Sequence, residues 1–376
     1  MRFSFSDEQE EFRRVVRRFF EDTSPAGEVR RLMETDEGFD PSVWSRMSSE
    51  LGLPGLHVPE EFGGQGFSFV ELGIALEEMG RAVFCAPYFS SAVLALSAIS
   101  SAASEPQKKE LLPGIVSGET RATLAFVEPA GVWDATGISL TATPTNGSFR
   151  LDGTKSFVLD GHTADEIVVV ARTPGTSGSE GLTLLRVDGD ASGLERKLLN
   201  TMDPTRKQAR LDFSGVHATP LGEPGAAGAA FSRTLDLAAV ALSSEMIGGA
   251  ERVLEETVAY AKVRMQFGRP IGSFQAIKHR CADLLLEVEL AKSAAYYAAS
   301  AAAEGDDSIP ALAALAKAAC SDAYRNVACA SIQIHGGVGF TWENDTHLYF
   351  KRARSSEAFL GDATYHRERL LQCWEI

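Results

Sequence analysis

The chain has 376 residues, 44% of them hydrophobic, and a formal net charge of −15 at pH 7. This length and apolar content exceed the needs of one ordinary domain and indicate a globular protein of two or three domains. The acidic balance argues against a nucleic-acid groove as the main activity, because phosphate binding depends on clustered Lys and Arg.

Residues 1–118 are predicted to be helical. The runs FSDEQEEFRRVVRRFFEDT and FVELGIALEEMGRAV carry apolar residues three and four positions apart, which is the period of an amphipathic helix. The stretch HVPEEFGGQGFS, rich in glycine, lies between them and predicts a break between helices. We therefore expect an N-terminal helical domain.

Residues 119–222 change to β-branched and alternating runs. Examples are ATLAFVEP, GISLTATPTNGSFRLDGTKSFVL, EIVVVART and GLTLLRVD, with NG, DG and Gly/Ser turns between them. This pattern predicts a small antiparallel β domain in the middle of the chain.

Residues 223–376 begin with the flexible-looking stretch GEPGAAGAA and then become helical again. Their long segments are rich in Ala, and their apolar character extends well around each helix. Such helices are typical of a bundle that is also buried between subunits, so we expect a C-terminal helical bundle and a dimer or higher oligomer.

Other features of the sequence mainly exclude functions. No apolar N-terminal segment suggests secretion or a membrane span, and the five cysteines form no CxxC pair, so a reducing cytoplasm is the expected location. His335, His347 and His366 lack a compact metal-ligand spacing, so we predict structural roles for them and no metal site. The Gly-rich stretches FGGQGF and HGGVGF are not dinucleotide-binding fingerprints.

Two motifs within this order of helix, β and helix resemble the acyl-CoA dehydrogenase family. They are RMQFGRPIGSFQAIKHRCADL (264–284) and QIHGGVGFTWE (333–343), and the likeness extends along the whole chain. The resemblance implies an α+β multidomain fold with an N-terminal helical domain, a middle β domain and a C-terminal four-helix domain. It also implies an oligomer that holds FAD where these domains meet a neighbouring subunit.

The activity implied by this resemblance is the α,β-desaturation of an acyl-CoA thioester. In the family, a carboxylate removes the α proton while the β hydrogen leaves as hydride to the flavin, which gives a trans-2-enoyl-CoA. The protein aligns the acyl chain, positions the base and polarises the carbonyl. The resemblance also implies electron-transfer flavoprotein as the acceptor of the electrons.

The motifs that face the ADP half of FAD in the family are complete in this chain. The Arg and Phe of R-x-x-F-G and the Gln and glycines of Q-x-x-G-G correspond to Arg264, Phe267, Gln333, Gly336 and Gly337. Arginine offers a fixed fork of donors to phosphate, and glycine lets backbone N–H groups approach closely. These residues are the expected cofactor-binding set on this side.

The flavin-ring side departs from the family. Where the family usually reads T-E-P-x-A-G-S-D, this chain reads VEPAGVWD, with Val127 in place of the hydroxyl donor and Trp133 in place of the small serine. Phe157 remains able to stack on the ring, but Leu159 has no hydroxyl to offer. Three polar contacts to the ring are therefore missing. Trp133 either fills flavin or pantetheine space or packs on its own loop.

The customary catalytic base is also absent. Leu360 stands at the usual glutamate position, and Ala238 stands where some relatives place a glutamate on the first long C-terminal helix. Two carboxylates remain as substitutes. Asp362 could serve as a relocated base, or as the N-cap of a following helix. Glu245 could serve as a base, but a buried partner for an Arg or His fits its apolar helix better.

Three interpretations follow from this pattern. The chain is either a working dehydrogenase whose base has moved to Asp362, or the catalytically reduced subunit of a heteromeric acyl-CoA dehydrogenase, or a flavin monooxygenase or oxidase relative on the same fold. Intact ADP-facing motifs beside an eroded ring-facing set favour the second interpretation, in which a partner subunit supplies the base.

Overall fold

The computed structural model describes residues 5–376, and they group into two compact units. The helical unit comprises residues 5–30, Phe69–Phe84 and Ala239–Ile376, and the β unit comprises Arg31–Ser68 and Cys85–Ala238. The border between the units falls within one long helix, α7 (Gly228–Val263). The predicted division into residues 1–118, 119–222 and 223–376 stays a prediction.

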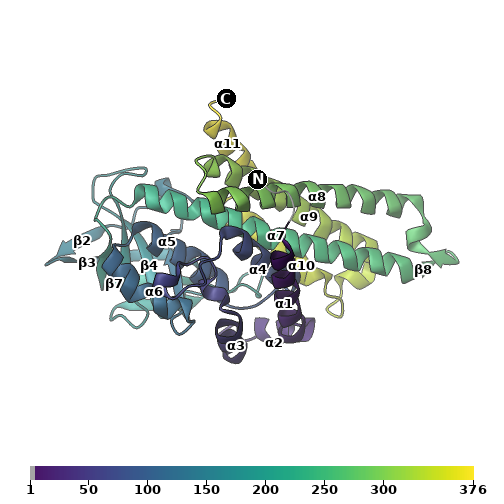
Figure 1. Cartoon of the computed structure of the whole chain (residues 1–376), viewed down its shortest axis with the longest axis horizontal. Coiled ribbons are helices and arrows are strands. Elements are labelled where there is room, and N and C mark those ends of the chain that lie inside the picture. Colours follow the sequence, from purple (N-terminus) through teal and green to yellow (C-terminus); the bar gives the residue numbers. More distant parts are fainter. Residues whose placement is uncertain (1–4) are drawn as a thin grey trace. The chain divides into compact units, whose positions relative to one another are not determined.

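The helical unit is built on long C-terminal helices (Figure 1). Besides most of α7, its helices are α1 (Asp7–Thr23), α4 (Phe69–Arg81), α8 (Gln275–Glu304), α9 (Ile309–His335), α10 (Thr346–Ala358) and α11 (Ala363–Cys373), and α2 (Ala26–Met33) begins in this unit. α8 packs along α9, which also contacts α10 and α11. Gly305 ends α8 in the left-handed conformation that favours glycine. No helix within residues 5–376 is long and apolar enough to cross a membrane.

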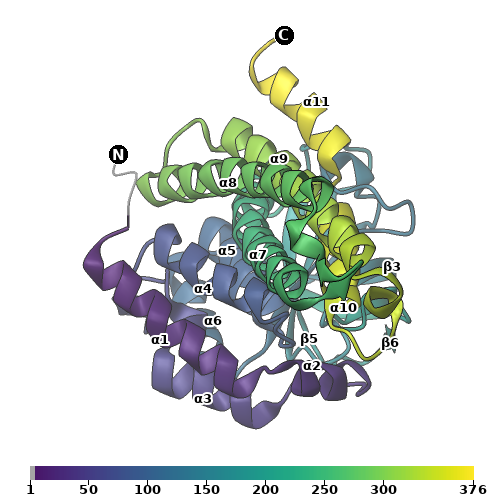
Figure 2. The ribbon, with the colours of Figure 1, turned by 90° about the vertical axis from the view of Figure 1, so that its right-hand side faces the viewer.

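α1 and α4 pack together in this unit through a capped helix start and buried charges (Figure 2). Ser6 and Gln9 form a reciprocal capping box at the start of α1. Arg13 of α1 then forms an ion pair of 2.8 Å with the buried carboxylate of Glu77 on α4. The amphipathic pattern of this segment thus folds as the sequence predicts.

α4 and α7 cross so closely that each helix needs a glycine at the contact. A Cβ atom added to Gly80 of α4 would lie 1.9 Å from the carbonyl oxygen of Glu245, and one added to Gly248 of α7 would lie 1.8 Å from that of Glu77. Larger residues at either place would force the two backbones apart. This crossing fixes the height of Glu245 on α7 relative to α4.

The β unit contains a seven-stranded sheet in the order β1-β4-β5-β7-β3-β2, with β6 also paired to β7. Its strands are β1 (Ala122–Ala125), β2 (Ala142–Thr145), β3 (Ser148–Leu159), β4 (Glu166–Arg172), β5 (Leu182–Asp188), β6 (Leu194–Leu198) and β7 (Gln208–Leu221). All pairs are antiparallel except β1 with β4. The antiparallel β domain expected from the alternating pattern is present, with this one parallel pair added.

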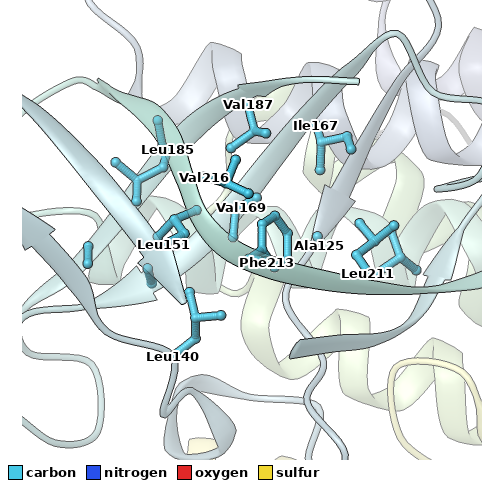
Figure 3. Packing of buried hydrophobic residues seen from close by; sticks show 14 of the residues in the cluster. Ala125, Leu140, Leu151, Ile167, Val169, Leu185, Val187, Leu211, Phe213 and Val216 are labelled. Carbon is cyan, nitrogen blue, oxygen red and sulfur yellow. The ribbon is translucent and has the colours of Figure 1, made fainter. Parts of the chain in front are cut away.

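The core of the β unit is formed by the inward-facing residues of these strands (Figure 3). Leu151, Val169, Leu211, Phe213 and Val216 are buried within it. The same unit contains the helices α3 (Pro41–Leu51), the π-helix η3 (Phe89–Ala95), α5 (Leu96–Ala102) and α6 (Glu105–Val116). Along much of β7 buried residues alternate with more exposed ones, as expected for a strand with one covered face, whereas nearly every residue of β1 and β4 is buried.

Candidate active site

Leu360 lies in the 359–362 turn, which joins α10 to α11. Its backbone is left-handed, with φ 64°, and only 4% of the residue is exposed. Gly361 follows with φ 96°, and a Cβ atom there would lie 2.4 Å from the ring of Tyr365. Gly361 is therefore required by the turn, and Leu360, at the position that the resemblance assigns to the base, has no carboxylate.

Asp362 is the N-cap residue of α11. Its carboxylate accepts a hydrogen bond of 2.8 Å from the backbone N–H of Tyr365, and its backbone is extended. The residue is exposed to solvent. The structure confirms the capping interpretation of Asp362, and the carboxylate is engaged in that role.

Glu245 is buried on α7 and forms an ion pair of 2.7 Å with Arg352 of α10. Arg352 also donates to the carbonyl oxygen of Phe84. The prediction that Glu245 is a buried partner for an arginine is confirmed. Ala238, at the position that the resemblance gives for an alternative base, is fully buried and apolar.

A β-bulge presents Phe157 to solvent. In the pairing of β3 with β7, Lys155 lies opposite Leu211 and Val158 opposite Ala209, so β3 holds one residue more than β7 in this interval. Phe157 within the bulge has φ 54°, and 40% of it is exposed. A left-handed phenylalanine is strained, and such strain persists only where the surroundings impose it.

Two further positions that the resemblance assigns to the flavin ring, 127 and 159, hold buried apolar residues. Val127 and Leu159 are almost completely buried. The carbonyl oxygen of Val127 accepts a hydrogen bond of 2.8 Å from the N–H of Ser156, and that of Leu159 accepts one of 2.6 Å from the hydroxyl of Thr123. These residues hold the sheet together, and their side chains have no donor to offer a ligand.

Trp133 packs against aromatic neighbours within the β unit. Its ring lies 6.1 Å from that of Phe126, which in turn lies 5.6 Å from that of Phe231. Trp133 is half-buried in this packing, and which of the two roles left open by the sequence it serves stays a prediction.

A buried ion pair supports the bulge and the 127–140 segment. Lys155 is completely buried, and its ammonium lies 2.8 Å from the carboxylate of Glu128 and 3.1 Å from the carbonyl oxygen of Phe126. Burial lowers the pKa of Lys155 to about 8, although Glu128 acts to raise it. For Glu128, burial acts to raise the pKa, but Lys155 and the hydrogen bonds outweigh it and the pKa is lowered.

Sequence reasoning missed this pair. Glu128 stands between Val127 and Pro129, and this isolated charge could have suggested a buried partner, whereas Lys155 stands between Thr154 and Ser156 and gives no such signal. The carboxylate of Glu128 also accepts a hydrogen bond of 2.8 Å from the backbone N–H of Leu140. One charge pair thus ties three segments of the β unit together.

Arg264 and Phe267 lie on a short hairpin of β8 (Met265–Gln266) and β9 (Arg269–Pro270), which joins α7 to α8 (Figure 1). Phe267 occupies the tip with φ 52°, and 90% of it is exposed. Arg264 is exposed and makes no ion pair within residues 5–376. Both side chains point away from the protein's own core.

The Q-x-x-G-G motif lies at the same end of the helical unit as this hairpin. Tyr260, one turn before Arg264 on α7, stacks on His335 at 4.1 Å between ring centres. His335 directly precedes Gly336 and Gly337, where an added Cβ atom would meet nothing within 4 Å. The backbone there is open to a ligand, so the exposed arginine and these glycines fit the ADP half of FAD.

The three histidines considered above have structural roles. His335 contacts the carbonyl oxygen of Ser331 at 2.8 Å, His347 lies 3.4 Å from a guanidinium nitrogen of Arg30, and His366 lies 2.9 Å from the carbonyl oxygen of Leu360. In the part of the chain that the structure describes, no cluster of His, Cys, Asp or Glu could hold a metal ion.

Comparison with known proteins agrees with this arrangement. Residues 6–119, 123–216 and 228–372 match the N-terminal, middle and C-terminal domains of acyl-CoA dehydrogenases. The acyl-CoA dehydrogenase IpdE2 of Mycobacterium tuberculosis is 36% identical over 350 residues, which are 92% of this chain and 91% of that protein. IpdE2 of Mycolicibacterium smegmatis is 33% identical over 97% of this chain and 98% of that protein.

Solved structures share the fold over nearly the whole chain. The chain is similar to a variant of the Tcur3481–Tcur3483 steroid ACAD, with 32% identity, a TM-score of 0.88 and coverage of 98% of both chains. It is also similar to the butyryl-CoA dehydrogenase of Megasphaera elsdenii, with 26% identity, a TM-score of 0.92 and complete coverage of both chains. The protein therefore belongs to the acyl-CoA dehydrogenase family of FAD-dependent oxidoreductases.

Proposed function

We propose that this chain is the subunit of a heteromeric acyl-CoA dehydrogenase that lacks the catalytic base, and that a partner subunit supplies the glutamate. The observation that carries the proposal is the 359–362 turn, where a buried leucine stands at the base position. The two substitutes are both engaged in the fold, since Asp362 caps α11 and Glu245 pairs with Arg352.

The chain's own residues divide into an intact and an eroded set. Arg264 and the open backbone at Gly336 and Gly337 would hold the pyrophosphate side of FAD. Val127 and Leu159 have no donors for the polar edge of the flavin. When bound, FAD supplies the two-electron oxidation of the acyl α,β bond. We infer that this chain contributes its hairpin to an FAD whose ring lies against the partner.

Exposed leucines on α8 support an assembly of subunits. Leu285, Leu286 and Leu290 are all exposed on one stretch of this helix. Apolar patches of this kind on a folded chain are typical of subunit interfaces. The partner in the proposal is a homologous chain that retains the glutamate and the ring-facing hydroxyl groups.

The proposed substrate is an acyl-CoA whose acyl group is attached to a steroid-derived skeleton. Its support is the likeness to a steroid ACAD that is named as a pair of chains. Electron-transfer flavoprotein is the proposed acceptor, because one relative belongs to a caffeyl-CoA reductase–Etf complex and another solved relative is described with an electron-transferring flavoprotein.

The proposal is tested by purifying the chain alone and after co-expression with a homologue that keeps the glutamate. We expect the lone chain to bind little flavin and to show no ferrocenium-coupled turnover, and the co-purified complex to show both. Steroid-derived and short-chain acyl-CoA substrates are compared in the complex. Robust turnover by the lone chain would contradict the proposal.

Asp362→Asn separates the role of a base from that of a cap. Asparagine caps helices about as well as aspartate, so the substitution removes the carboxylate and keeps α11 intact. We expect turnover of the complex to change by less than about twofold, whereas loss of a positioned base would lower it by about two orders of magnitude. Asp362→Ala, which loses the cap as well, serves as the control for stability.

Arg264→Ala should weaken FAD retention in the complex by about 10- to 100-fold, because a buried pyrophosphate loses a charge-assisted pair of hydrogen bonds. The measurement is a titration of FAD into the flavin-free complex. Arg14→Ala is the matched control, since Arg14 is an exposed arginine on α1 whose ion pair within residues 5–376 is with nearby Glu11. Equal FAD affinity in the two variants would remove Arg264 from the binding set.

A further inference from the structure

The 359–362 turn is held from its inner side by a lysine of α9. Lys317 is completely buried, and its ammonium donates to the carbonyl oxygens of Glu357 at 3.1 Å and Gly361 at 2.9 Å. A third contact, 3.1 Å long, joins it to the hydroxyl of Ser321 one turn further along α9. Two of these acceptors belong to the backbone on either side of Leu360.

The carbonyl oxygen of Leu360 itself is held by a second buried side chain. Nε2 of His366 lies 2.9 Å from it, and His366 is almost completely buried on α11. A carbonyl oxygen only accepts, so Nε2 carries the proton and donates. Three carbonyl groups in a stretch of five residues thus accept from side chains that lie on α9 and α11.

These hydrogen bonds offset the energetic cost of a left-handed backbone at Leu360. Leu360 has φ 64°, a region that residues other than Gly, Asn and Asp rarely occupy. Lys317 and His366 donate to main-chain carbonyl groups, so these hydrogen bonds do not require a particular side chain at position 360. The left-handed conformation at position 360 is thus held by contacts that do not involve its side chain.

We propose that Lys317 and His366 are positioning residues that fix the backbone of the 359–362 turn and thereby set the direction of the side chain at position 360. That position 360 corresponds to the place of the base in catalytic relatives rests on the proposed function. The holding of the turn does not, since it follows from the hydrogen bonds alone. Lys317 acts only through the turn and takes no part in proton transfer.

The test is hydrogen exchange of backbone amides, measured by mass spectrometry on the protein in the assembly in which it purifies. In Lys317→Met, we expect amides of residues 357–362 to exchange at least about tenfold faster than in the wild type, with the central part of α9 within about twofold. Lys317→Arg, which retains a cation with several donors, should recover most of the protection. His366→Phe should act like Lys317→Met, whereas His366→Gln, which keeps a donor, should not.

Leu360→Met is the matched control, because it changes the side chain and leaves the backbone contacts in place. It should leave exchange in the turn within about twofold of the wild type. Unchanged exchange in Lys317→Met would overturn the proposal, and so would acceleration spread equally over α9, α11 and the turn. The readout requires no turnover, so failure of the heteromeric assignment and failure of this proposal give different results.

Discussion

Arg352→Met should lower the free energy of unfolding by about 3–5 kcal/mol, because the substitution leaves the carboxylate of Glu245 buried without its cation. Arg352 and Glu245 lie 2.7 Å apart, and both are buried between α10 and α7. The guanidinium also holds the carbonyl oxygen of Phe84, so a second group loses a donor. The measurement is denaturant unfolding of the variant and the wild type in the same assembly.

Two further variants distinguish the loss of an ion pair from the cost of leaving one buried charge unpaired. Arg354→Met is the matched control on the same helix, because the Arg354 side chain is 45% exposed and Glu357 keeps Arg325 as a second cation, so the substitution should cost less than about 1 kcal/mol. The double variant Glu245→Leu with Arg352→Met removes both charges, and we expect it to recover most of the lost stability. If Arg352→Met proves no worse than Arg354→Met, the pair contributes little and the burial argument is wrong.

Acidification below pH 6.5 should destabilise the protein through two buried histidines. Burial lowers the pKa of His57 to about 4 and, with a contribution from Lys317, that of His366 to about 3, from an ordinary value of 6.5. Between those values the unfolded chain binds protons that the folded chain does not. Each histidine then removes up to about 1.4 kcal/mol of stability per pH unit, starting at its unfolded pKa and ending at its folded one.

The assay is the free energy of unfolding at several pH values between about 7 and 5. His366→Gln should flatten the slope by nearly one proton, since glutamine does not titrate but keeps a donor toward Leu360. His217→Gln serves as the control for loss of an exposed imidazole, because His217 is exposed on β7. A wild-type slope near zero over this interval would show that both histidines take up protons in the folded state.

The order of elements and the roles of single residues were predictable where the signal is local. The helical and alternating periods gave α1, α4 and the strands of the β unit, and Asp362 follows a glycine just before an amphipathic run, which is where an N-cap belongs. Glu245 stood out because a carboxylate in an apolar helix requires a partner. In each case the physical requirement lies within one or two turns of chain.

The contact partners of these buried charged residues could not be predicted from the sequence. Glu245 and Arg352 are 107 positions apart, and Lys317 contacts carbonyl groups 40 and 44 positions away, which no periodicity encodes. Because Lys317 donates to backbone carbonyl groups, no acidic residue in the sequence marks its partner. The packing of Trp133 on Phe126 was likewise undecided until the loop was seen folded.

The bulge in β3 has a consequence for how the protein can change over evolution or by engineering. Because the extra residue is accommodated between Lys155 and Val158, the strand on both sides keeps its alternation toward the core whatever ring stands at position 157. The aromatic side chain there can be exchanged without repacking the sheet, provided that the residue accepts a left-handed backbone. Substitutions at position 157 can therefore change the aromatic surface available to a planar ligand, while the core residues of the sheet continue to stabilise the fold.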